Sequence, residues 1–182
     1  MTTLPIAAAN DRDYPRWSET LRDHSTVLIR PIVPEDKAAE REFIEHLSPE
    51  AKHFRFMGQI GTPSDRLLEQ LTDVDRIHDV AFVAVAGDGP RERIVGVSRY
   101  GADANGSRCE CAITVADAWQ DKGLGTSLMK HLIEVARSHG MRTMYSIDAA
   151  DNAGMRELAS YLGFARRSDP DDPSQVIHEL QL

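Results

Sequence analysis

Hydrophobic and polar residues follow two different periods along the chain, and together these periods predict a mixed α/β fold. Short apolar or alternating runs rich in β-branched residues predict strands at 26–31, 80–86, 94–100, 108–115, 143–147, from 164 onward and at 176–180. Apolar residues spaced three or four apart predict helices after residue 34, from Ser48, after Ser64, over 123–139 and over 152–162.

The order of these elements predicts one mixed, mostly antiparallel sheet with helices on both faces. Three consecutive strands between residues 80 and 115 are separated by turn signals, of which Asn105-Gly106 is the strongest, and are expected to pair antiparallel. The last of these strands, the helix 123–139 and the strand 143–147 form a βαβ unit. This unit is expected to be the one parallel step, with a right-handed connection.

The chain has 182 residues, which is enough for one domain with its own core. Residues 26–182 are predicted to form this domain, whereas residues 1–25 show little periodicity and are predicted to be an extension that packs loosely on it. Met1 to Asn10 lack the basic start and apolar run of a signal peptide, and no segment is predicted to span a membrane. We therefore expect a cytoplasmic protein, monomeric or homodimeric.

Composition excludes several functions. The chain carries 21 basic and 29 acidic residues, a net charge of −8, which disfavours nucleic acid or an anionic membrane as partner. Cys109 and Cys111 lie two apart in a predicted strand, where a disulfide is geometrically poor, and we expect two reduced core thiols. The seven histidines show no metal-binding spacing, so no metal is expected.

Residues 115–128 hold the first candidate chemistry. A strand ends at Val115, and Gly123 and Gly125 open a helix whose first amides lack backbone partners. Glycines there let the backbone approach a ligand closely, the helix start favours an anion such as pyrophosphate, and Lys122 adds a positive charge. Taken alone, the same pattern also fits an ordinary tight turn from strand to helix.

The wider pattern resembles the GNAT superfamily of N-acetyltransferases. Gln120-x-x-Gly123-x-Gly125 is similar to its acyl-CoA motif, and Asn152 followed by a helix ending in Gly163-Phe164 is similar to its next motif. The resemblance implies the GNAT fold, with acetyl-CoA as co-substrate. It also implies that the backbone of Val115 binds the pantetheine arm and that Asn152 holds the far side of the CoA. The pyrophosphate is then expected to be wrapped by Gln120, Asp121, Lys122, Gly123, Leu124, Gly125 and Thr126. Asp121 departs from the superfamily pattern and is expected to point to solvent or to pair with Lys122.

Glu110 is the candidate general base. Only a neutral amine attacks a thioester, and a lysine amine, with a pKa of about 10.4, is mostly protonated at neutral pH, so a base that removes its proton is useful. Glu110 shares one strand face with Ala112 and Thr114, where small neighbours leave room for a substrate. From the residues alone, the pattern favours an exposed or ion-paired structural glutamate over a catalytic one. Residues 110–115 are similar to the strand that carries the glutamate base in Pat-type protein lysine acetyltransferases. Residues 28–36 and 47–56 are similar to other parts of the same proteins. This resemblance implies that Glu110 is catalytic.

The sequence says less about the acceptor of the acetyl group than about the donor. The Pat-type resemblance implies a protein lysine, while a small-molecule amine acetyltransferase and a catalytically silent acyl-CoA sensor are the alternatives. Many GNAT enzymes carry a tyrosine general acid at the position of Ala159, so none is assigned here, and Tyr161 is expected to face elsewhere. The acceptor site is expected to be lined by His53, Arg55 and Phe56. Core packing is expected for Phe82, Tyr100 and Trp119.

Overall fold

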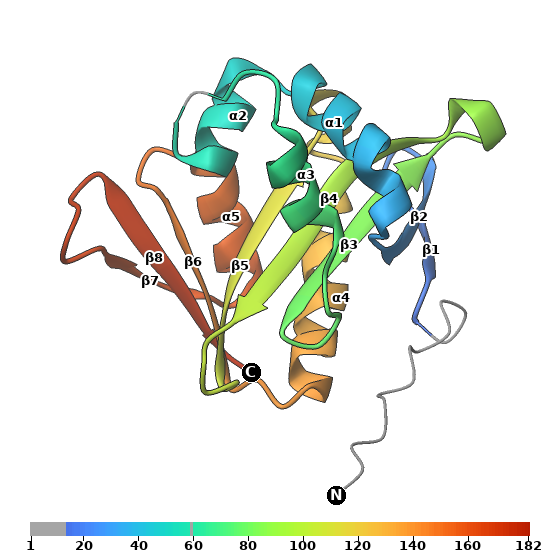
Figure 1. Ribbon diagram of the computed structural model, residues 1–182. Coiled ribbons are helices and arrows are strands. Elements are labelled where there is room, and N and C mark those ends of the chain that lie inside the picture. The colour runs from blue at the N-terminus through green and yellow to red at the C-terminus, as the bar shows by residue number, and fades with distance from the viewer. Residues whose placement is uncertain (1–13, 59) are drawn as a thin grey trace, which may run out of the picture.

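The computed structural model describes residues 14–58 and 60–182 (Figure 1). These residues form an eight-stranded sheet with the order β1-β2-β3-β4-β5-β6-β8-β7. The strands are β1 (Trp17–Thr20), β2 (Thr26–Pro31), β3 (Asp79–Ala86), β4 (Arg93–Ala102), β5 (Arg108–Val115), β6 (Thr143–Ala149), β7 (Ala165–Ser168) and β8 (Gln175–Gln181). The helices are α1 (Lys37–His46), α2 (Pro49–Phe56), α3 (Asp65–Thr72), α4 (Leu124–Ser138) and α5 (Ala153–Leu162).

The predicted mixed sheet is confirmed, because β5 and β6 pair in parallel and every other pair of neighbours is antiparallel. Helices α1 to α3 cover one face, and α4 and α5 cover the other (Figure 1). Each face has its own apolar core. Phe82 and Tyr100 are almost fully buried in the core beneath α4, and Trp119 packs against the same core, as expected. Cys109 and Cys111 are both buried and free.

Local sequence signals place the helix ends. The side chains of Ser48, Ser64 and Asn152 accept hydrogen bonds from backbone amides three residues further on, at 3.0–3.2 Å, and so cap α2, α3 and α5. Gly163 ends α5 with a φ of +87°, a conformation that glycine adopts without strain. The segment before α1 is held by two hydrogen bonds from Arg30 to Asp36, at 2.7 and 2.8 Å.

The described part of residues 1–25 does not pack loosely. Trp17–Thr20 form β1, which pairs with β2 at the edge of the sheet. The Trp17 ring stacks on His131 at a centroid distance of 4.0 Å and meets the edge of Phe82 at 5.2 Å. Four residues are too few for a convincing period, and it is this tertiary packing that makes them a strand. Residues 1–13, the rest of the predicted extension, lie outside the described residues.

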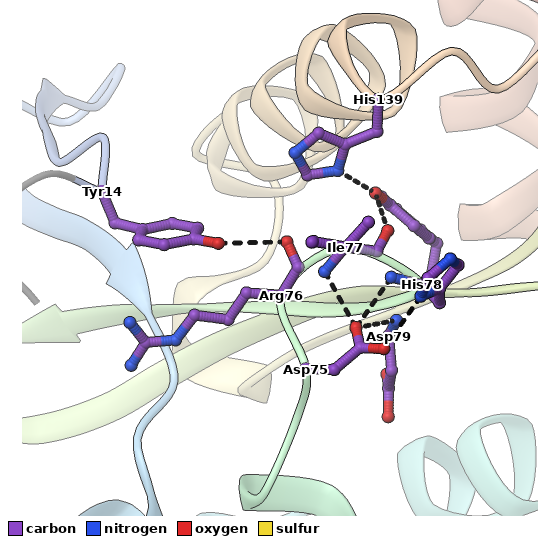
Figure 2. A network of polar contacts seen from close by, with 8 residues as sticks. Tyr14, Asp75, Arg76, Ile77, His78, Asp79 and His139 are labelled. Atoms are coloured by element: carbon purple, nitrogen blue, oxygen red, sulfur yellow. Dashed lines mark hydrogen bonds and ion pairs between the residues drawn. The ribbon is translucent and has the colours of Figure 1, made fainter. Parts of the chain in front are cut away.

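A polar network anchors the connection between α3 and β3 (Figure 2). One carboxylate oxygen of Asp75 accepts hydrogen bonds from the amides of Ile77, His78 and Asp79 at 2.7–2.9 Å. The hydroxyl of Tyr100 donates to the carbonyl of Ile77 at 3.0 Å and lies 2.7 Å from Nδ1 of His139. Because His139 follows α4, the network fixes the sheet at the end of α4 opposite Gly123.

The two strands of the parallel step separate soon after they meet. Pairing between β5 and β6 covers only three residues of each strand and ends at Glu110 and Tyr145. Each strand nevertheless stays paired with its other neighbour, as far as Val115 in β5 and Ala149 in β6. The carboxyl-terminal halves of β5 and β6 therefore diverge (Figure 1), and their facing backbone groups are open to a ligand.

Candidate active site

A cavity of about 630 Å³ occupies the opening between β5 and β6. Its walls come from the divergent halves of these two strands, from α2, from the start of α4 and from α5. It brings together most of the residues that the sequence singles out, namely Glu110, Val115, Gln120, Asp121, Gly123, Gly125, Thr126 and Asn152. Lys122 and Leu124 do not line it, and the Leu124 side chain is buried in the core.

The start of α4 has the geometry of an anion site. Gly123, with a φ of +91°, is the N-cap, and no side chain accepts a hydrogen bond from the first turn of α4 in the described structure. The first helical amides therefore remain available at the cavity wall. A Cβ on Gly125 would lie 3.6–3.8 Å from Leu158, Ile113 and Val115, all of which line the cavity. The missing side chain of Gly125 thus keeps this part of the cavity open.

The positive charges near the start of α4 are arranged differently from what the sequence predicts. Lys122 forms an ion pair with Asp23 at 2.9 Å, and its Nζ lies 5.0 Å from the centre of the Trp119 ring. Asp121 is exposed and borders the cavity, and Lys122 pairs with Asp23 rather than with Asp121. Arg22, in the connection between β1 and β2, lines the cavity, and its Nε lies 3.6 Å from a Cβ built on Gly123. Sequence periodicity gave no signal for Arg22, because its position depends on β1.

Two predicted cavity residues already have structural roles. The side chain of Gln120 donates a hydrogen bond to the carbonyl of Val115 at 3.3 Å, which links the loop to the end of β5. Asn152 accepts the capping hydrogen bond of α5 through Oδ1, at 3.0 Å, and leaves its amide nitrogen free to donate. Both residues therefore shape the cavity wall.

Glu110 stands where β5 and β6 begin to separate. Its side chain is exposed and lines the cavity on the same strand face as Ala112 and Thr114. Its partner across the β4–β5 ladder is Gly101, and a Cβ built there meets nothing within 4 Å, so space is open beside the carboxylate. Burial and then the negative charge of Glu110 raise the pKa of Tyr145, its neighbour in β6.

A polar group missed by the sequence reading lies in the opposite wall. One oxygen of Asp148 accepts a hydrogen bond from the Ser146 hydroxyl at 2.6 Å and lies 2.9 Å from Nδ1 of His178. His178 is 2% exposed, and these contacts hold Asp148 at the cavity surface. The three residues come from two strands, so no local motif could have identified them.

Of the three residues expected to line the acceptor site, only one lines the cavity. Arg55 lines the cavity, whereas Phe56 packs into the core beneath α1 to α3 and His53 does not reach the cavity. Tyr161 faces a different side of α5 from Ala159, as expected: it is 67% exposed, its ring centre lies 5.7 Å from Nζ of Lys130, and it borders the cavity. The helical turn explains this, since Ala159, two residues earlier, is fully buried and points the opposite way.

Two further features are absent from residues 14–58 and 60–182. No group of three or more His, Cys, Asp or Glu side chains there could hold a metal ion. In the same ranges, no helix combines the length and the apolar character that crossing a membrane requires.

The chain is similar in sequence and in structure to known acetyltransferases. Residues 42–164 match the acetyltransferase (GNAT) family. The chain is 51% identical to acetyltransferase PA5475 of Pseudomonas aeruginosa over 175 residues, 96% of this chain and 93% of that protein. It is 30% identical to acetyltransferase Pat of Mycolicibacterium smegmatis over 136 residues, 74% of this chain but only 40% of Pat. The crystal structure of the GNAT domain of S. lividans PAT superimposes with a TM-score of 0.85 at 26% identity, covering 93% of this chain and all of that domain.

Proposed function

Since the chain belongs to the acetyltransferase (GNAT) family, we propose that it transfers an acetyl group from acetyl-CoA to a primary amine. The observation that carries this proposal is the continuous opening between β5 and β6. It leads from the uncapped amides of α4 at one end to the carboxylate of Glu110 at the other.

In this proposal the diphosphate of CoA binds at the start of α4. The amides of Gly125 and Thr126 donate to it, and the helix dipole favours its negative charge. Arg22 supplies the nearby positive charge, because Lys122 is already paired with Asp23. The pantetheine arm runs between β5 and β6, where the backbone of Val115 has no strand partner on the β6 side, and Asn152 borders its other side.

The chemistry is direct transfer. The neutral amine attacks the thioester carbonyl, a C–N bond forms, and Glu110 accepts, through water, the proton that the nitrogen loses, because Glu110 and Val115 lie five residues apart along β5. The amide of Val115 stabilises the oxyanion of the tetrahedral intermediate. When the C–S bond breaks, the CoA thiolate leaves and takes a proton from water, since no side chain is assigned as general acid.

For the acceptor we propose a lysine ε-amine on a protein. The similarity to acetyltransferase Pat and to the PAT domain supports this choice, as does the net charge of −8, which favours a cationic acceptor. A small-molecule amine is the second candidate, because the chain covers only 40% of Pat and the family fold alone does not set the substrate. The proposed setting is the cytoplasm, with a monomer or homodimer as the active form.

The test supplies acetyl-CoA with two sets of acceptors, a cellular protein extract and a panel of polyamines, aminoglycosides and amino acids. Release of free CoA thiol measures turnover, and mass spectrometry locates the acetyl group. Enzyme-dependent acetyl-lysines on proteins support the full proposal. Efficient turnover of one small amine without protein acetylation refutes the lysine acceptor and retains N-acetyl transfer. Tight acetyl-CoA binding without turnover of any amine refutes the enzyme and favours a silent sensor.

A further inference from the structure

The side chain of Arg55 lines the part of the cavity where the acceptor is proposed to bind, and it has no hydrogen-bond partner within the described residues. It lies in the last turn of α2 and lines the cavity on the same side as Ala51 and Phe54. Within the described residues, no oxygen accepts a hydrogen bond from its guanidinium group, whose carbon stands 5.0 Å over the ring of its neighbour Phe56. An arginine with unused donors in a cavity wall can pair with an anionic group of a ligand.

Two residues near Arg55 hold further polar atoms without a hydrogen-bond partner among the described residues. Glu40 of α1 is 3% exposed, and one of its carboxylate oxygens makes no hydrogen bond among the described residues. Arg99 of β4 likewise has a buried Nε without a partner there. Burial and then Arg99 lower the pKa of Arg55 to about 10, against the opposing effects of Glu40 and Glu110, so Arg55 remains charged at neutral pH. Direct contacts between Glu40, Arg55 and Arg99 therefore do not neutralise their charges.

The start of helix α2, which carries Arg55, is tied to the sheet near the proposed base. The backbone amide and hydroxyl of Ser48 donate hydrogen bonds to Asp117 at 3.0 and 2.7 Å, which ties the start of α2 to the segment after β5. Helix α2 packs against β5, whose residues Glu110 and Ala112 line the same cavity. Ala112 is the ladder partner of Arg99, so Arg99 lies on the Glu110 face of the sheet.

We propose that Arg55 binds a carboxylate of the acceptor, so that the enzyme selects amines carried next to an acidic group. A planar guanidinium with free donors suits a carboxylate, with which it forms two parallel hydrogen bonds. The carboxylate comes either from an acidic residue beside a protein lysine or from the amino acid that bears the amine. This inference rests on the proposed function and names the substrate class of the same cavity.

The competing explanation is that Arg55 acts only on Glu110, through its charge. In that case its loss affects every amine alike and changes the pH dependence of turnover. Carboxylate binding instead affects only acceptors that carry a carboxylate, chiefly through KM. Pairs of acceptors that differ only in a carboxylate or a carboxamide therefore separate the two roles.

The experiment uses capped lysine peptides with Asp or Asn beside the lysine, together with free lysine and lysinamide. Turnover with acetyl-CoA and calorimetric binding to the CoA-loaded protein are measured for wild type, Arg55→Gln, Arg55→Lys and the control Arg91→Gln, which replaces an exposed arginine outside the cavity. In at least one pair, wild type is expected to favour the carboxylate by about tenfold or more in kcat/KM. Arg55→Gln lowers kcat/KM for the carboxylate member of that pair more than for its carboxamide partner and so removes the preference, Arg55→Lys keeps part of it, and Arg91→Gln keeps all of it.

The peptide pair and the free-lysine pair show which source supplies the carboxylate. Equal kcat/KM values within every pair for wild type, or an equal loss for both members in Arg55→Gln, overturns the inference while amine acetylation stands. If wild type acetylates no amine, the proposed function fails separately. Calorimetry then decides the carboxylate site, which is refuted if the CoA-loaded protein binds both members of each pair equally.

Discussion

The buried carboxyl group of Glu40 should make the stability of this fold depend on pH in a way that one substitution removes. Burial raises the pKa of Glu40 from 4.5 to about 7, and the positive charges of Arg99 and Arg55 oppose only part of this rise. Between these two pH values, the folded chain holds a proton on Glu40 that the unfolded chain has already released.

The sign follows from proton binding. The folded state binds more protons than the unfolded state in this window, so the free energy of unfolding falls as the pH rises through it. Each pH unit is worth about 1.4 kcal/mol, so the raised pKa corresponds to a loss of about 3 kcal/mol that is complete slightly above pH 7. Glu40→Gln is neutral at every pH and has no such loss. Its free energy of unfolding, relative to wild type, should therefore increase by about 3 kcal/mol between pH 4.5 and pH 8.

Urea unfolding followed by circular dichroism at several pH values and constant ionic strength measures this difference. Glu42→Gln is the matched control, because Glu42 lies in the same helix but is exposed. Its stability relative to wild type should stay nearly constant over the same range. A Glu40→Gln difference that is equally flat would refute the reasoning, since it would mean that Glu40 ionises as readily in the folded chain as in the unfolded one.

Two further predictions concern the CoA half of the cavity. Arg22→Gln should weaken acetyl-CoA binding about 3- to 10-fold, a modest effect because Arg22 is exposed and solvent screens its charge. The variant should turn over S-acetylpantetheine, which lacks the diphosphate, as fast as wild type does. An equal loss of binding and of turnover with acetyl-CoA and with S-acetylpantetheine, measured by calorimetry and kinetics, would exclude a phosphate contact. Gly125→Ala should bind CoA nearly normally, because its Cβ makes only ordinary contacts, whereas Gly125→Leu should block binding by filling the cavity. A folded leucine variant with wild-type CoA affinity would disprove the second statement.

Much of the fold could be predicted because its signals are local. The strand Thr26–Pro31 has the predicted bounds, and Ser48, Ser64 and Asn152 cap the helices that their sequence context indicated. The parallel step also follows from the order of elements alone, because a strand, a helix and a strand in succession have few ways to pack.

The remaining features depend on contacts between distant segments. Four residues of β1 carry too little pattern to predict a strand, so the position of Arg22 beside Gly123 was out of reach. The early separation of β5 and β6 leaves no mark in either strand's own pattern.

The pH profile of turnover by Glu110→Gln, with the best amine from the acceptor panel, tests the central claim most directly. Glutamine keeps the shape of the side chain but accepts no proton, so turnover at neutral pH should fall about 10²- to 10⁴-fold while CoA affinity stays nearly unchanged. The deficit should shrink at high pH, where more of the amine is already neutral. Turnover equal to wild type across the pH range would contradict the account and leave Glu110 a structural residue.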